Sequence, residues 1–391
     1  MAARIEPGRP VQPLPMLVGT AALALFLAIT GATVAPRQAL LMLVAAGLGV
    51  VLYHGALGFT AYWRRWLLNR EGRGVRIQLA IVALGTLAFF PLIGGWLPGF
   101  TAGGAVAPLA LELVVGAFLF GVGMQLANGC GSGTLFTLGG GSTKMLLTLA
   151  AFVVGSLAAT FHLHLWRTLP QLPAVSLVVE FGILGGWLAQ ASILGGVAVL
   201  VIRLERRPVP APSPTGDILR GPWPPFAAAG ALAVLAVAVF WLSGQPWGVT
   251  FAFALWGGQL FEALGGDLSG VPFWSAAWAR GALDASPLQN TTSVTNIGVI
   301  LGALIASSLA GRFDPPLVVP WRHALAAVLG GLLMGYGARL AYGCNIGAFL
   351  GGTMSGSLHG WLWLAAALVG AWLGVRLRPR FGLRNEPAEV G

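Results

Sequence analysis

Residues 116–133, GAFLFGVGMQLANGCGSG, return in the second half of the chain as residues 330–347, GGLLMGYGARLAYGCNIG. Laid over each other without a gap, the two segments are identical at 9 of 18 positions, and the only two cysteines, Cys130 and Cys344, coincide. Glycine matches count for little in a chain with 58 glycines, but a match of both cysteines at a constant offset of 214 is hard to obtain by chance. The chain therefore contains an internal duplication.

The composition around these segments is that of a membrane protein. Hydrophobic residues make up 57% of the 391 residues and charged residues only 9%, whereas soluble domains carry roughly 25% charged residues. The mean hydropathy is +0.82. The net charge of +10 comes from 22 basic and 12 acidic residues, too few charges to form a nucleic-acid-binding face. The composition excludes an ordinary soluble enzyme and a nucleic-acid partner, and it predicts an all-α polytopic protein in the lipid bilayer.

Apolar stretches of roughly 20 residues, the length that spans a bilayer, occur eleven times. They cover residues 16–35, 39–60, 77–96, 108–127, 145–161, 177–202, 223–242, 248–264, 293–310, 324–341 and 361–375. The first stretch follows Arg4 and Arg9 but has no small-residue cleavage site, so we expect it to remain as a helix.

Arginines cluster in three connections, at residues 64–76, 203–220 and 376–384. Because such clusters favour the cytoplasm, all three are predicted to face inside. Four stretches separate the first two clusters, and an even number of spans places both clusters on the same side of the membrane. Five stretches separate the second cluster from the C-terminal tail, and this odd number means that one of the five should not cross. The weakest is 248–264, which we expect to be re-entrant or broken. About ten transmembrane helices and a cytoplasmic C terminus follow.

A Pro-rich linker, RPVPAPSPTGDILRGPWPP at residues 207–225, predicts a division of the chain near its middle. Residues 1–206 then hold the Cys130 segment and residues 226–391 hold the Cys344 segment. Counting spans from the arginine clusters places Cys130 at the cytoplasmic end of its helix and Cys344 on the outer side. The repeats are therefore expected to be inverted, an arrangement that places a transport pathway between them.

The residues after each cysteine predict interrupted helices. GSGTLFTLGGGSTK follows Cys130 and NIGAFLGGTMSGS follows Cys344, and their glycines and hydroxyls disfavour one continuous helix. We expect two loops that enter from opposite faces, each exposing backbone N–H groups and one thiol. Free N–H groups attract anions, and a polarizable thiol suits a soft sulfur atom better than a hard oxyanion, so the predicted ligand is a small sulfur-containing anion.

The candidate substrate-binding residues are those of the two Gly-Cys turns and one nearby cation each. They are Gly129, Cys130, Gly131, Ser132, Gly133 and Lys144 in the first repeat, and Gly343, Cys344, Asn345, Gly347 and Arg339 in the second. Each cysteine could instead be a small residue that only packs in the interior. Each cation could instead extend its side chain to the membrane interface at the end of its helix. Glu112, Glu180 and Glu262 could carry protons or be wetted at helix ends. The five histidines form no ligand pattern, so no metal or other cofactor is expected.

The chain resembles the YeeE/YedE sulfur-transport family, in particular its long two-repeat YedE-like members. The resemblance is carried by NGCGSGTL (128–135), YGCNIGAFLGG (342–352), GFTAYWRRWL (58–67) and GQPWGVTFAFALWGG (244–258). It implies an hourglass-shaped inner-membrane protein of inverted repeats that takes up thiosulfate, with Cys130 and Cys344 as thiols that hand the ion along a narrow pore. Thiosulfate transporters of the family carry a further thiol near the position of Gly58, and its absence leaves another sulfur or selenium species open as the substrate.

A membrane enzyme that oxidises or transfers sulfur through Cys130 and Cys344 is the main alternative, and a scaffold subunit is a third. Redox pairs are usually close in sequence, as in Cys-X-X-Cys, whereas these thiols are expected to enter from opposite sides. That arrangement favours serial contacts with a transported ion, so we expect a transporter and not an enzyme. A cytoplasmic sulfur-carrier protein is a candidate partner.

Overall fold

The computed structural model describes residues 10–100, 102–206 and 217–385. Most of these residues lie in long apolar helices, which satisfy their own backbone hydrogen bonds inside lipid. In the described ranges the strands are β1 (Leu109–Ala110) and β2 (Gln171–Leu172), which pair antiparallel. The all-α class is confirmed. Residues 207–216 of the predicted linker lie outside the described residues, and the division of the chain at the linker stays a prediction.

Ten helical segments of the described chain are long and apolar enough to cross a membrane, which confirms a multi-pass membrane protein. They comprise α1 (Pro13–Thr33), α2 (Pro36–His54) with α3 (Phe59–Asn69), α4 (Arg73–Ile93), α5 (Leu111–Ala127) with α6 (Gly131–Gly139), α7 (Thr143–Trp166), α8 (Leu177–Leu204), α9 (Pro225–Ser243), α13 (Thr291–Leu309), α14 (Trp321–Leu340) with η2 (Asn345–Gly351) and α15 (Gly352–Met354), and α16 (Leu358–Leu377) with η3 (Arg378–Phe381).

The stretch 248–264, predicted not to cross, forms the short helix α10 (Thr250–Ala263). Its 14 residues reach about 21 Å at 1.5 Å per residue, less than the roughly 30 Å of a bilayer core. Short elements follow it: α11 (Pro272–Ser275), α12 (Ala277–Asp284) and η1 (Pro287–Gln289). The helix is therefore too short to cross a bilayer by itself.

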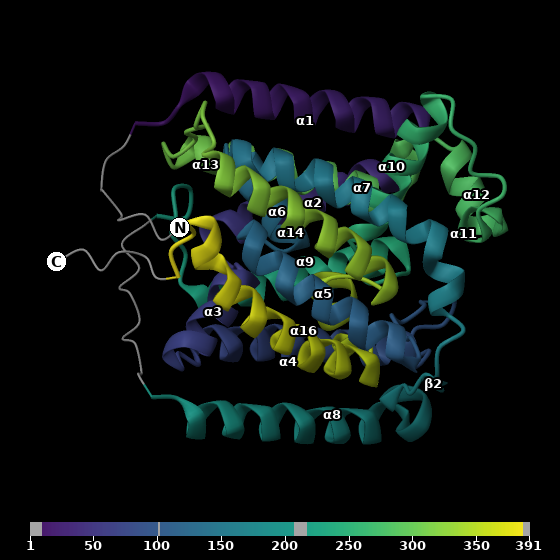
Figure 1. The fold of residues 1–391 in the computed structure, drawn as a ribbon. Helices are drawn as coiled ribbons and strands as arrows, with labels where there is room; N and C mark the ends of the chain where they lie inside the picture. The colour runs from purple at the N-terminus through teal and green to yellow at the C-terminus, as the bar shows by residue number, and fades with distance from the viewer. Residues whose placement is uncertain (1–9, 101, 207–216, 386–391) are drawn as a thin grey trace.

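The helices that carry the duplicated segment cross near the middle of the bundle. In α5 and α14, Gly116 lies against Gly337 and Gly123 lies against Gly330, so the two helices run antiparallel. Helix α7 packs against α14, and α16 packs in the same way against α5. At the periphery α1 packs against α13 and α8 packs against α4, on opposite sides of the bundle (Figure 1). The contacts therefore repeat when α1, α4, α5 and α7 exchange with α8, α13, α14 and α16.

Glycines allow these helices to approach backbone to backbone. A Cβ atom added at Gly302 of α13 would lie 1.9 Å from the Ala46 carbonyl oxygen of α2. One added at Gly370 of α16 would lie 2.0 Å from the Phe118 carbonyl oxygen of α5. Such contacts leave no room for a side chain, and small residues at helix crossings are what membrane helices use to pack closely.

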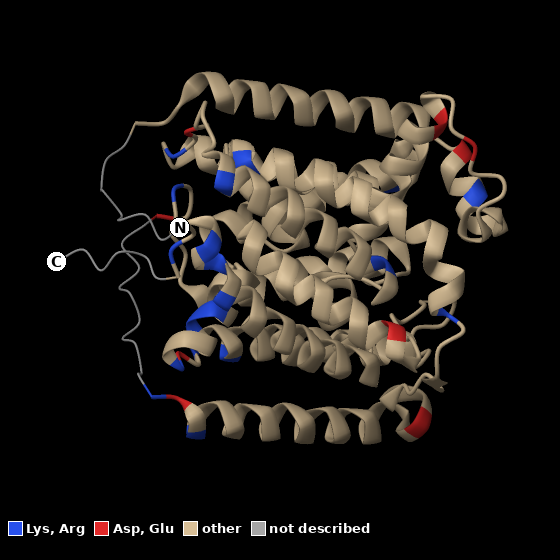
Figure 2. Ribbon diagram, in the orientation of Figure 1, with Lys and Arg blue, Asp and Glu red and all other residues tan. Residues whose placement is uncertain are grey.

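The three arginine clusters lie at one end of the bundle. Arg64 and Arg378 donate hydrogen bonds to the same Asn128 Oδ1, at 2.9 and 3.2 Å, which joins the first cluster to the C-terminal segment. Arg76 pairs with Glu205, beside the second cluster, and its hydrogen bond lowers the pKa of that carboxyl. Lys and Arg residues gather at the end of the bundle that lies to the left in Figure 2. The clusters thus share one side, as predicted, and its assignment to the cytoplasm stays a prediction.

Candidate functional site

The chain reverses direction in the same way after α5 and after α14. Asn128 and Tyr342, which differ by the repeat offset of 214, both adopt the left-handed conformation, with φ of 66° and 58°. This conformation is uncommon outside glycine and costs of order 1 kcal/mol or more. A side-chain contact holds each residue: Asn128 accepts from Arg64 and Arg378, and the Tyr342 hydroxyl donates to Glu112. Each turn leads through one glycine into a cysteine.

Both cysteines stand at the start of a short helix. Cys130 is the N-cap of α6, and its Sγ accepts from the Gly133 N–H at 3.4 Å and lies 3.6 Å from Ser132 Oγ. Cys344 begins η2, a π-helical segment that continues into α15, and its side chain makes no capping hydrogen bond. Cys344 therefore differs from Cys130, whose side chain caps its helix.

The prediction of irregular loops after the cysteines was wrong for the first turns of each run. Residues 131–139 and 345–354 are helical, and the breaks fall just before each cysteine and near residues 140–142 and 355–357. Most glycines of these runs are buried and the rest are half-buried, so packing stabilises helices that glycine propensity alone disfavours. A π-helical turn is rare and is often found at functional sites.

The two turns meet in the interior of the protein. A Cβ added at Gly131 would lie 3.0 Å from Cys344 Sγ and 3.6 Å from Val249 Cγ1, so the Cys344 thiol packs against the residue that follows Cys130. Both thiols are free, and the two cysteines are 1% and 0% exposed. Cys130, Gly131 and Cys344 are thus brought together as one buried group from both repeats.

Several residues on the segments that meet at this group have buried polar atoms without partners among the described residues. Asn345, beside Cys344, is fully buried, and neither its Oδ1 nor its Nδ2 has a hydrogen-bond partner among the described residues. In the same described set the Trp247 Nε1 and the Asn296 Oδ1 are also buried without a partner. An unsatisfied buried polar group costs roughly 1–3 kcal/mol. Such groups in a native interior call for an explanation, and a polar ligand or water supplies one.

Trp247 and Asn296 were not among the residues predicted for the site. Trp247 precedes Gly248, whose Cα lies 3.8 Å from the position of a Cβ on Gly347. The Asn296 amide donates to the Val249 carbonyl at 2.9 Å and so fixes the same segment. The GQPWGVT segment carried part of the family resemblance, which was the available signal for Trp247. Asn296 offers no signal in the sequence, because α13 brings it there from a distance.

The two predicted cations have other neighbours. Lys144 lies in the first turn of α7, within electrostatic reach of Arg64 and Arg378. Arg339 lies over the rings of Phe251 and Phe273, with its guanidinium carbon 5.8 Å from each centroid. Lys144 therefore lies at the basic end of the bundle, and Arg339 lies in an aromatic cluster that includes Phe251 of α10. That either cation contacts the substrate stays a prediction.

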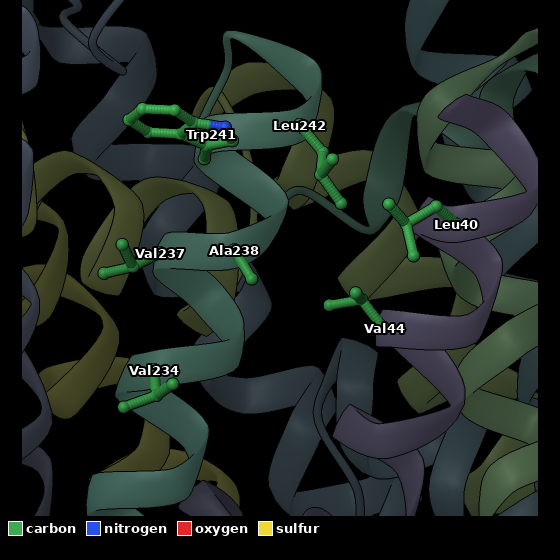
Figure 3. A pocket seen from close by; sticks show the side chains of 7 residues that line it. All are labelled: Leu40, Val44, Val234, Val237, Ala238, Trp241 and Leu242. Atoms are coloured by element: carbon green, nitrogen blue, oxygen red, sulfur yellow. The ribbon is translucent and has the colours of Figure 1, made fainter. Parts of the chain in front are cut away.

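An apolar groove of about 440 Å³ lies between α2 and α9, away from the cysteines (Figure 3). It is lined by Leu40, Val44, Val234, Val237, Ala238, Trp241 and Leu242. Most of these side chains are partly or fully exposed and hydrocarbon in nature, so the groove fits lipid chains better than an anion.

A family model described as sulphur transport matches residues 54–373. The chain belongs to this family. It is 28% identical over 351 residues to the thiosulfate transporter TsuA of Spirochaeta thermophila, an alignment that covers 85% of this chain and 96% of that protein. The TsuA of Escherichia coli is 25% identical over 361 residues, with 85% and 92% covered.

The probable transporter YedE of Escherichia coli is 32% identical over 154 residues, which cover 39% of this chain and 37% of YedE. The resemblance to the YeeE/YedE family read from the Gly-Cys segments is thereby confirmed. Membership of the sulphur-transport family makes this protein a transporter and not an enzyme, as the sequence predicted.

Proposed function

We propose that this sulphur-transport family member takes up thiosulfate across the inner membrane through the constriction between its two cysteine turns. The observation that carries the proposal is the fully buried amide of Asn345, which has no hydrogen-bond partner among the described residues, beside the free thiol of Cys344. A buried amide and a thiol at the start of a helical run form a dry polar site, with donors for oxyanion oxygens and a soft contact for sulfur. Two relatives named as thiosulfate transporters, each aligned over 85% of the chain, support the choice of ion.

The chemistry of the site suits an anion that has lost its water. Backbone N–H groups at the start of η2 and the Asn345 Nδ2 can replace water at the oxyanion oxygens. The thiols of Cys130 and Cys344 can meet the terminal sulfur in turn, because the residues around them pack directly against each other. Both thiols are closed off from solvent, so transport requires the turns to move apart on one side at a time.

The position of Gly58 bears on which sulfur species is carried. Gly58 is the N-cap of α3, with φ of −90°, and a Cβ added there would have nothing within 4 Å. The space that a further thiol would fill is therefore open in this chain. Another sulfur or selenium species is therefore the alternative substrate, and a cytoplasmic sulfur-carrier protein is the partner that would receive the product.

Uptake of labelled thiosulfate tests the proposal. Cells that depend on thiosulfate for sulfur and lack their own carrier should accumulate the label when this chain is produced in their inner membrane. Label at the level of cells without the chain would reject thiosulfate as the substrate, and selenium-containing or larger sulfur anions would then be compared in the same assay.

Replacing Asn345 by leucine should lower thiosulfate uptake while leaving the protein as stable as before or more stable. Leucine has a similar shape, and it removes a buried amide that is unpaired among the described residues, which costs about 1–3 kcal/mol. The measurement is thermal unfolding in detergent together with uptake at matched protein levels. A loss of stability with normal uptake would show that Asn345 holds the fold and does not bind the ion.

A further inference from the structure

Glu112 is a buried acid close to one of the cysteine turns. It lies in the first turn of α5 and is 2% exposed. Its Oε1 accepts a hydrogen bond from the Tyr342 hydroxyl, while its Oε2 is buried with no partner among the described residues. Within the same described ranges no Lys or Arg forms an ion pair with it. The carboxyl therefore has one oxygen held in place and one oxygen free to bind a proton.

The neighbouring elements offer little compensation for a negative charge on Glu112. On the elements packed against this end of α5 and beside them, the titratable or charged side chains are Tyr336, Arg339 and Tyr342 on and after α14, His359 on α16, His162, His164 and Arg167 at the end of α7, and Glu180 at the start of α8. Tyr342 packs edge-on against His359, with ring centroids 6.4 Å apart, and Arg167 is close enough to Tyr342 to act on it electrostatically. A buried carboxylate without a paired cation is costly, and binding a proton removes that cost.

The link from Glu112 to the site runs through Tyr342. This residue precedes Cys344 by two positions, in the left-handed turn that presents the thiol. Glu112 thus holds the turn whose thiol and amide form the proposed anion site. A dianion in that site would repel an ionised Glu112, because like charges disfavour the charged form of an acid. By linkage, a proton on Glu112 and an anion in the site favour each other by the same factor.

We propose that Glu112 binds a proton together with the anion and releases it on the other side of the membrane, so that anion uptake is coupled to proton entry. The proton comes from water on the outer side, forms an O–H bond at Oε2, and returns to water on the inner side; nothing is oxidised or reduced. This inference rests on the proposed function, because it requires an anion in the cysteine site.

The test uses the full protein in proteoliposomes with labelled thiosulfate. Two measurements are made: counterflow without any proton gradient, and accumulation under an inward proton gradient with the membrane potential clamped. The variant Glu112→Gln keeps an acceptor for the Tyr342 hydroxyl but cannot take up a proton. Glu180→Gln is the matched control, because Glu180 also lies in the first turn of a long helix, α8, but is exposed.

Wild type and Glu180→Gln should accumulate thiosulfate under the gradient, whereas Glu112→Gln should not accumulate it, whatever counterflow it retains. Wild type that shows thiosulfate counterflow but no accumulation under the gradient would overturn the inference and leave the proposed function intact. Accumulation by Glu112→Gln would also overturn it. Wild type without thiosulfate counterflow would reject the proposed function, and this inference with it.

A pH series decides the question if Glu112→Gln loses counterflow as well. In the wild type the Km for thiosulfate should fall by about fivefold or more as the outside pH is lowered. About fivefold is the lower limit of the change in affinity that coupled binding sites usually show. Glu112→Asp, which keeps a titratable carboxyl, should retain this dependence. A Km that is independent of pH in the wild type would contradict the inference without reference to any variant.

Discussion

Replacing either Cys130 or Cys344 by alanine should reduce thiosulfate uptake by about tenfold or more, because a hydrogen bond to a charged group contributes roughly 1.5–3 kcal/mol. Alanine removes the donor and the polarizable sulfur together. Serine keeps a donor of similar size but loses the soft contact, so the Ser variants should be impaired less than the Ala variants. Labelled uptake at matched protein levels, with thermal unfolding as the control for folding, measures the effect.

The two positions should differ in their effect on stability. Cys130 caps α6 through the Gly133 N–H, whereas the Cys344 side chain makes no capping bond. Cys130→Ala should therefore lower the unfolding temperature more than Cys344→Ala does, while serine, a good N-cap, should restore it at position 130. Normal uptake by both Ala variants would show that the two cysteines only pack in the interior and do not contact the ion.

Replacing Gly302 by alanine should prevent the protein from reaching its folded state in the membrane. The new Cβ would lie 1.9 Å from the Ala46 carbonyl oxygen and 2.6 Å from its carbonyl carbon, so α13 would have to move away from α2. Separating these helices opens a buried interface and disturbs α6, which packs on the same helix. The expected result is a severe loss of monodisperse protein after solubilisation.

Gly230→Ala in α9 is the matched control, because a Cβ there has nothing within 4 Å. Alanine is favoured over glycine in a helix by about 1 kcal/mol, so this variant should be as stable as the wild type or more so. Both variants are compared by size-exclusion profile and thermal unfolding. A well-folded Gly302→Ala protein would show that the α2–α13 contact is looser than the structure describes.

Much of the architecture could be predicted because repetition and charge are visible in the chain. The duplicated segment placed both cysteines after equivalent helices, and the structure gives both the same left-handed turn at Asn128 and Tyr342. The parity of spans between arginine clusters required that one stretch should not cross, and the weakest of them, 248–264, forms a helix of 14 residues. These features depend on local composition or on symmetry, and both can be read from one sequence.

The rest depends on contacts between distant segments. The helices α6 and η2 are rich in glycine, so their local propensity argues against them, and tertiary packing decides otherwise. The neighbours of Arg339 come from the segments around Phe251 and Phe273, and Asn296 reaches the Val249 carbonyl from another helix. No pattern in one segment specifies such pairs.

Competition between thiosulfate and sulfate tests most directly whether a thiol-lined site recognises sulfur. Both ions carry two negative charges, but sulfate presents four hard oxygens that hold water strongly, and it offers a thiol no soft atom. A difference of about 1.4 kcal/mol in transfer into the dry site already gives a tenfold preference. In proteoliposomes that hold the wild-type protein, with labelled thiosulfate well above its Km, a tenfold excess of unlabelled thiosulfate should suppress uptake of the label by about tenfold, and the same excess of sulfate should leave most of it. Equal suppression by sulfate would show that charge alone is recognised, and would contradict the role of the two thiols.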